Sequence, residues 1–239
     1  MSWDELWQEI GEKSLLHLRD YPQNIDHELK INGFSHNDNA LISNESLFIY
    51  AKSIVENLQI RNNSNLWEFG CGTGLFISTV AKMACAAQYG GSDNSNSMID
   101  LAKLNYPSGI FFTDSALNSK VPFSDSYIFA NSVFQYFPNL DYARGVLRNV
   151  ILNSPRAFAL LDIPHGDFSG QLIERRGNSK FKLFHQKYSP DFFYEYFQNK
   201  PYFLEIRSQK IDGYEQSQER FNVFGFSVNF SSGNSKNLK

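Results

Sequence analysis

The feature that most constrains the fold is a short apolar run that ends in a glycine-rich turn. It reads Leu66-Trp67-Glu68-Phe69-Gly70-Cys71-Gly72-Thr73-Gly74, and a helix-like apolar stretch follows it. Gly70 and Gly72 allow positive φ angles and let a ligand approach the backbone without a Cβ in the way. The unpaired N–H groups at the start of the next helix favour a polar or anionic group. The segment therefore predicts a strand, a ligand-binding turn and a helix.

Strand-like and helix-like segments alternate after this turn. Alternation of this kind predicts an α/β fold with a parallel sheet and right-handed crossovers. The expected strands are 66–69, 86–91, 110–113, 127–130, 157–163, 202–208 and 221–228. The expected helices are 75–85, 97–105, 140–152 and one that begins at Ser189-Pro190. The strand at 157–163 is apolar throughout, which is typical of a parallel strand covered on both faces.

The N-terminal part of the chain predicts two helices over one end of the sheet. Ser2 and Glu5 have the spacing of a capping box, so the first helix is expected to begin at Ser2. Ser43 or Asn44 is expected to cap a second helix. Residues 20–42 between them are polar and irregular in pattern. We expect a helical cover over 1–62 and a disordered tail over 231–239.

Composition limits the kind of protein that this chain can be. Its 239 residues are 42% hydrophobic, which suits one sizeable core. A net charge of -3 argues against a nucleic-acid partner, because such domains usually carry a basic face. The two cysteines make no disulfide framework, and no His/Cys cluster has the spacing of a metal site. Without a signal peptide or a membrane-length apolar run, we expect a cytoplasmic protein with no membrane insertion and no metal.

The glycine spacing separates two families of nucleotide-binding enzymes. A dinucleotide fingerprint needs a third glycine at position 75 or 77, where this chain has Leu75 and Ile77. The spacing E-x-G-x-G-x-G from Glu68 instead resembles motif I of class I S-adenosylmethionine-dependent methyltransferases. The resemblance implies a Rossmann-like, seven-stranded, mainly parallel sheet with an antiparallel last strand. It also implies a methyltransferase domain over 63–230 and S-adenosylmethionine as the cofactor.

The resemblance also implies roles for residues after the first four strands. Asp93 stands about 20 residues beyond the turn, where an acid binds the ribose hydroxyls. Asp114 matches the acid that accepts from the adenine amino group, and Ser115 offers a backbone N–H to the ring. Backbone carbonyls near Asn131 are placed to hold the methionine ammonium. The predicted cofactor-binding residues are Glu68, Gly70, Cys71, Gly72, Asp93, Asn94, Met98, Asp114, Ser115 and Asn131.

Two further segments and one histidine bear on the methyl acceptor. Residues 131–138 (NSVFQYFP) and 220–223 (RFNV) look similar to methyltransferases associated with bacterial surface-polysaccharide synthesis. This likeness implies a small-molecule acceptor, such as a hydroxyl of a sugar or sugar-like metabolite. His165 follows the fifth strand, near the cleft of an open α/β sheet, and is the candidate general base. A loop histidine with no chemical role is the alternative for this residue.

Three other functions stay open at this point. A nicotinamide-dependent oxidoreductase is disfavoured by the glycine spacing. A non-catalytic module that binds S-adenosylmethionine is compatible with the lack of an obvious base other than His165. A nucleic-acid methyltransferase is disfavoured because Asn131 is followed by Ser, Val and Phe, and not by the Pro-Pro-Tyr of that class. The sequence leaves the acceptor, the methylated atom and the oligomeric state undecided.

Overall fold

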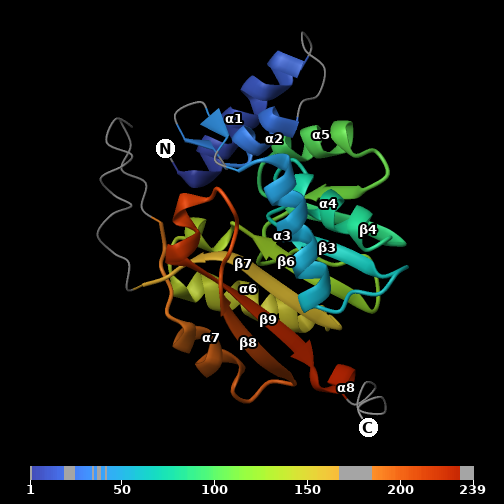
Figure 1. Ribbon diagram of the computed structural model, residues 1–239, viewed down its shortest axis with the longest axis vertical. Helices are drawn as coiled ribbons and strands as arrows, with labels where there is room; N and C mark the ends of the chain where they lie inside the picture. The colour runs from blue at the N-terminus through green and yellow to red at the C-terminus, as the bar shows by residue number, and fades with distance from the viewer. Residues whose placement is uncertain are drawn as a thin grey trace.

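The chain folds around one seven-stranded sheet with helices on both faces (Figure 1). The computed structural model describes residues 2–18, 25–33, 35–36, 39–40, 42–166 and 185–231. The strand order is β5-β4-β3-β6-β7-β9-β8. The strands are β3 (Asn65–Phe69), β4 (Gln88–Asp93), β5 (Ile110–Thr113), β6 (Ser126–Asn131), β7 (Ala157–Pro164), β8 (Tyr202–Ser208) and β9 (Arg220–Ser227).

The direction of the strands confirms the predicted fold class. The first five strands of the sheet, β3 to β7 in chain order, pair with one another in parallel. The last strand in sequence, β9, is inserted between β7 and β8 and runs antiparallel to both. The central strands β6 and β7 are buried along their whole length, as expected of strands with helices on both faces.

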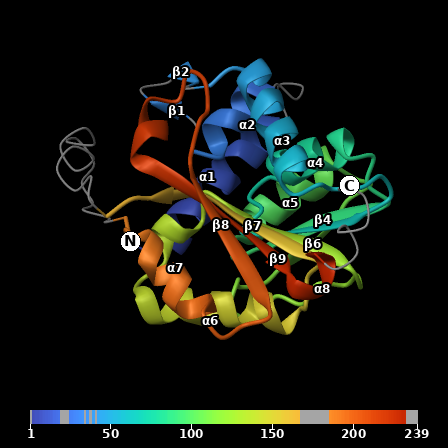
Figure 2. The ribbon, with the colours of Figure 1, turned by 60° about the horizontal axis from the view of Figure 1, so that its bottom comes forward.

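Helices cover the two faces of the sheet and divide the apolar core into two main layers. One layer includes α3 (Asn44–Asn57), α4 (Leu75–Met83) and α5 (Asn96–Asn105), and the other includes α6 (Leu140–Leu152) and α7 (Pro190–Phe197). Figure 2 shows α6 and α7 on the opposite side of the sheet from α3 and α4. The short elements are η1 (Phe134–Tyr136), η2 (Glu215–Glu219) and α8 (Val228–Ser231).

Helices α1 (Trp3–Leu18) and α3 begin at the capping residues that the sequence predicts. Helix α1 begins with the predicted capping box: Ser2 N–H donates to Glu5 Oε2 at 2.6 Å, and Glu5 N–H donates to Ser2 Oγ at 3.2 Å. Helix α3 begins after Ser43, whose side chain accepts from Ser46 N–H. The residues of α3 share an apolar layer with those of α4, so this helix is packed directly on the sheet domain.

The stretch expected to be irregular contains an additional helix. Helix α2 (Ile25–Ile31) and the short strands β1 (Ser35–His36) and β2 (Asn39–Ala40) lie within 20–42, so that part of the prediction is wrong. The helix buries Glu28, whose carboxylate accepts from Asn105 Nδ2 and Tyr106 O–H at 2.5 Å each. These partners come from the end of α5, far along the chain, so local pattern carried no signal for them.

Helices α1 and α2 together lie over α5 and the turn after β3. Gln8 of α1 accepts at its carbonyl from Ser97 Oγ at 2.8 Å, and its side-chain oxygen accepts from Ser95 Oγ at 3.1 Å. Among the described residues no helix is long and apolar enough to cross a bilayer. Ser231 closes α8, and the rest of the expected tail lies outside the described residues.

Candidate functional site

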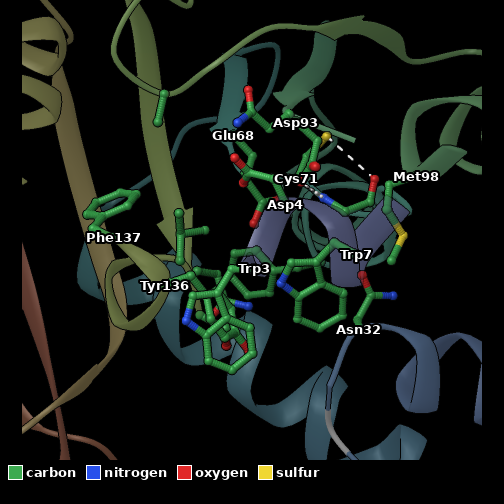
Figure 3. Close-up of a pocket in the computed structure, with 18 of the residues that line it drawn as sticks. Trp3, Asp4, Trp7, Asn32, Glu68, Cys71, Asp93, Met98, Tyr136 and Phe137 are labelled. Carbon is green, nitrogen blue, oxygen red and sulfur yellow. Dashed lines mark hydrogen bonds between the residues drawn. The ribbon is translucent and has the colours of Figure 1, made fainter. Parts of the chain in front are cut away.

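A cavity of about 380 Å³ opens at the carboxyl ends of β3, β4 and β6 (Figure 3). This volume lies in the usual range of small-molecule sites, roughly 300–1,000 Å³. It is lined by the turn after β3, the start of α1, the end of α2 and the η1 segment. Nine of the ten predicted cofactor residues line it, namely Glu68, Gly70, Cys71, Gly72, Asp93, Asn94, Met98, Asp114 and Asn131.

The glycine turn is fixed by the neighbouring strand and has no room for a side chain at Gly70. The N–H groups of Gly70 and Cys71 both donate to the Ser92 carbonyl, at 2.7 and 3.0 Å. Gly70 and Gly72 have φ angles of 70° and 52°, in the left-handed region that glycine tolerates. A Cβ on Gly70 would lie 2.4 Å from a Val133 methyl carbon. The turn therefore requires glycine for its shape as well as for ligand access.

Asp93 connects the glycine turn to the start of α5. Its Oδ2 accepts from Gly72 N–H and its Oδ1 accepts from Ser95 N–H, both at 2.9 Å. Burial raises the pKa of Asp93, while these two backbone hydrogen bonds favour its charged form. Each carboxylate oxygen has a second lone pair. Asp93 can therefore accept hydrogen bonds from two neighbouring hydroxyls of a ligand in the cavity.

Two buried oxygens without a hydrogen-bond partner face this site. Glu68 is 1% exposed and Asn131 is 7% exposed, and neither Glu68 Oε2 nor Asn131 Oδ1 has a partner in the described part of the chain. Burial raises the pKa of Glu68 well above its usual range, and the charge of Asp93 adds to the effect. A buried polar atom usually finds a partner. Both side chains line the cavity, so a donor such as an ammonium group suits this position.

Asp114 and Ser115, which follow β5, differ in their position relative to the cavity. Asp114 lines the cavity together with Met98 and Ala116. Ser115 does not line it, and its backbone N–H donates to Asp114 Oδ1 at 2.8 Å. In this structure the N–H orients the Asp114 carboxylate, and its contact with the ligand ring stays a prediction.

The structure does not bring His165 to the cavity wall. Its ring lies edge-on to Phe221, with 5.5 Å between the ring centroids. Its backbone N–H donates to the Glu219 carbonyl at 3.0 Å, and the residue is absent from the cavity lining. The predicted base follows β7 as expected, but its side chain is directed toward the β9 side of the strand.

Several lining residues were not predicted, and most come from the N-terminal helices. Figure 3 shows Trp3, Asp4 and Trp7 of α1 projecting toward the cavity. The rings of Trp3 and Trp7 contact Tyr136 with centroid distances of 4.7 and 5.3 Å. Asn32, at the end of α2, donates to Thr73 Oγ1 at 2.7 Å. Trp3 and Trp7 are four residues apart and so share one face of the first helix. This spacing was the only sequence signal that pointed to their place in the site.

The cavity is acidic. Its lining holds four carboxylates, those of Asp4, Glu68, Asp93 and Asp114, and no Lys, Arg or His side chain among the described residues. The charge of Asp4 contributes to the raised pKa of Asp93, after the larger effect of burial. The described residues also include no group of three or more His, Cys, Asp or Glu that could hold a metal ion. This surface favours a cationic ligand and disfavours an anionic one.

Comparison with known families and structures agrees with this fold. Residues 67–151 match the model of the family described as "Methyltransferase domain". Magnesium protoporphyrin IX methyltransferase from Synechocystis PCC 6803, solved with bound SAH, is similar with a TM-score of 0.58 and 12% identity, over 93% of this chain and 95% of that one. DesVI from Streptomyces venezuelae is similar with a TM-score of 0.62 and 11% identity, over 87% of this chain and 100% of that one.

A third solved structure shows how widely this fold is used. The small RNA methyltransferase HEN1 is similar with a TM-score of 0.56 and 16% identity, over 74% of this chain and 24% of that one. At identities of this size the likeness establishes the fold alone. The segment that matches the family model, residues 67–151, contains the glycine turn, Asp93, Asp114 and Asn131.

Proposed function

We propose that this chain, an S-adenosylmethionine-dependent methyltransferase of the class I fold, methylates a hydroxyl of a small, uncharged, sugar-like acceptor. The observation that carries the proposal is the charge of the cavity. Four acidic side chains and no cationic side chain of the described residues line it. Such a lining attracts a sulfonium cofactor and repels acceptors that carry phosphate or carboxylate groups. A nucleic-acid acceptor is disfavoured for the same reason.

The residues of the cavity fit the cofactor along its length. Glu68 Oε2 and Asn131 Oδ1, which have no partner in the described residues, would hold the ammonium group. Asp93 would accept from the ribose hydroxyls, and Asp114 from the adenine amino group. Met98 would pack on the adenine ring from α5. The bound cofactor supplies an electrophilic methyl group on a sulfonium, and the protein supplies alignment and a site that excludes water.

The remaining wall of the cavity suits the face of a ring-shaped acceptor. Trp3, Trp7, Tyr136 and Phe137 contribute aromatic rings to it. Aromatic side chains present a large apolar surface, and indole N–H and phenol O–H groups can still hydrogen-bond a polar ligand. The apolar C–H face of a sugar could pack on these rings while its hydroxyls find polar partners.

We expect Glu68→Gln to stabilise the free protein and weaken cofactor binding. Because burial raises the pKa of Glu68, its contribution to stability is present at low pH and is lost as the pH rises through that raised pKa. Glutamine removes this loss, so the variant should melt higher than the wild type near pH 8 and match it near pH 4. Its affinity for S-adenosylmethionine should fall roughly 10- to 100-fold, since glutamine still offers an acceptor oxygen but loses the negative charge that strengthens the hydrogen bond to the ammonium group.

Two measurements check this prediction against a matched control. Thermal melting across pH gives the stability, and calorimetric titration gives the affinity. Glu56→Gln changes an exposed carboxylate of α3 and should alter neither quantity. A Glu68→Gln variant that binds S-adenosylmethionine as tightly as the wild type would contradict the assignment of Glu68 to the ammonium group.

A panel of paired acceptors tests the proposed function. The wild-type protein is incubated with S-adenosylmethionine and with monosaccharides, their methyl glycosides and the corresponding sugar phosphates, and also with RNA. S-adenosylhomocysteine and the methylated product are measured by mass spectrometry. We expect methylation of an uncharged sugar hydroxyl, with kcat/KM at least about tenfold above that of its phosphorylated partner. Methylation of only the phosphates or RNA, or of none of these compounds, would contradict the proposal.

A further inference from the structure

Two residues with left-handed backbone lie side by side at the carboxyl ends of β6 and β7. Ser132 has a φ angle of 56° and Asp162 one of 57°. The Ser132 hydroxyl donates to Asp162 Oδ2 at 2.7 Å, and the Ser132 N–H donates to the Leu161 carbonyl at 3.1 Å. Residues with a side chain rarely adopt this conformation, and those that do are often found at functional sites. Their pairing at neighbouring strand ends is therefore typical of a functional site.

Asp162 makes further hydrogen bonds besides the one from Ser132. The residue is 1% exposed. Gln209 Nε2 donates to its Oδ1 at 2.8 Å, and its own N–H donates to Asn222 Oδ1 at 3.0 Å. The pairing of β7 with β9 is irregular between Leu160 and Ile163, which is where Asp162 departs from the strand. The carboxylate thus has a fixed position and a fixed set of partners.

Arg220 of β9 supplies the opposite charge in this buried network. Its Nε lies 3.8 Å from Asp162 Oδ1, with both side chains 1% exposed. Its Nη1 donates to Gln135 Oε1 at 2.9 Å and to the Asp162 carbonyl at 3.2 Å. Gln135 belongs to segment 131–138 and Arg220 to segment 220–223, so the two segments singled out in the sequence meet here. Burying two opposite charges often costs as much free energy as their attraction returns, so stability alone does not explain why the pair is here.

Ser132 connects this network to the cavity. It lines the cavity between Asn131 and Val133, whereas Asp162 and Arg220 do not reach the lining. With its proton donated to Asp162, the Ser132 oxygen can accept a hydrogen bond from another group. The cavity opens at the carboxyl ends of the parallel strands and includes Ser132 in its lining, so an acceptor bound beside the cofactor would lie near Ser132.

We propose that Ser132 is a catalytic residue that takes the proton of the acceptor hydroxyl, and that Asp162 is a positioning residue that receives the proton of Ser132 in turn. This inference rests on the proposed function. In the step, the bond from sulfur to the methyl carbon breaks and the bond from the acceptor oxygen to that carbon forms. The hydroxyl proton moves to Ser132 Oγ as the Ser132 proton moves to Asp162 Oδ2. The cationic donor and the carboxylate become a neutral thioether and a carboxylic acid, so charge is balanced.

The test compares Ser132→Ala and Asp162→Asn with the wild type on the best hydroxyl acceptor of the panel. We expect kcat to fall about 100-fold or more in both, as for the loss of a general base. The affinity for S-adenosylmethionine by calorimetry should stay within about twofold, because neither residue is assigned to the cofactor. Ser126→Ala is the matched control: Ser126 is a buried serine at the other end of β6 whose Oγ has no partner among the described residues. It should retain the wild-type kcat.

A thiol analogue separates a proton-transfer role from a structural one. In this probe the methylated hydroxyl of the acceptor is replaced by a thiol, which ionises near neutral pH without a base. Ser132→Ala should methylate the thiol analogue at close to the wild-type rate, whereas a disturbed site would lose both activities. Equal losses on the two probes, or an unchanged kcat on the hydroxyl, would overturn the role of Ser132.

The same experiment distinguishes this inference from the function on which it rests. If the wild type methylates no hydroxyl compound of the panel, the proposed function fails and this inference fails with it. If the wild type is active and Ser132→Ala is equally active, this inference alone fails. A crystal structure with S-adenosylhomocysteine and the acceptor adds a second readout. It should place the reacting hydroxyl within about 3 Å of Ser132 Oγ, and a hydroxyl hydrogen-bonded elsewhere would contradict the inference.

Discussion

Gly72→Val should weaken the binding of S-adenosylmethionine by about 100-fold or more. Gly72 has a φ angle of 52°, which a β-branched residue strongly disfavours. A Cβ at this position would also lie 2.4 Å from Asn32 Oδ1, so the Asn32 side chain must move away, and the disfavoured φ angle makes the turn itself change shape. The Gly72 N–H that donates to Asp93 Oδ2 would move with it. The expected loss corresponds to about 2.8 kcal/mol or more.

Calorimetric titration measures this loss, and thermal melting checks that the variant is folded. Gly166→Val is the matched control, because the nearest described atom to a Cβ there would be the Tyr188 carbonyl oxygen, at 3.5 Å. Gly166 is outside the cavity lining, so this control should bind like the wild type. A folded Gly72→Val variant with unchanged affinity would show that the turn does not hold the cofactor.

Arg220→Met should lower the free energy of unfolding by about 3–5 kcal/mol, because it leaves a buried carboxylate without its opposite charge. Burial acts to lower the pKa of Arg220, but the charge of Asp162 together with smaller effects of neighbouring groups raises it overall, so the guanidinium is charged in the folded protein. Methionine removes the hydrogen bonds to Gln135 and Gln216 as well. Its apolar side chain fills part of the space but cannot satisfy Asp162.

Urea unfolding monitored by tryptophan fluorescence measures this destabilisation. Arg144→Met is the control, because Arg144 pairs with Asp141 at the surface, where the two side chains are 50% and 90% exposed. Exposed pairs contribute roughly 0–1 kcal/mol, so this variant should unfold close to the wild type. Equal, small effects of the two substitutions would mean that the Asp162 network does not carry a buried charge.

The parts of the fold that depend on local sequence were predicted well. The strand, glycine turn and helix that begin at β3 depend on residues that are neighbours in the chain, and the structure confirms them. The caps at Ser2, Ser43 and Ser189 are local as well. Carboxyl ends of parallel strands meet at one edge of a sheet, so Asp93, Asp114 and Asn131 could be assigned to one site from their places in sequence.

The missing parts depend on contacts between distant segments. Helix α2 is fixed by Glu28 and the end of α5, which no periodicity in 20–42 reveals. The pairing of Ser132 with Asp162 requires two neighbouring strands to end in left-handed residues. Neither a serine nor an aspartate signals such a conformation. The direction of the His165 ring depends on packing against Phe221 of β9, and chain position alone does not determine it.

The central claim is that the cavity beside the glycine turn holds an adenosyl cofactor and not a dinucleotide. Calorimetric titration of the wild-type protein with S-adenosylmethionine, S-adenosylhomocysteine and NAD tests it most directly. We predict one site per chain for both adenosyl compounds and no binding of NAD, because Leu75 and Ile77 stand where a dinucleotide turn needs glycine. Binding of NAD in place of the adenosyl compounds, or binding of none of the three, would contradict the account.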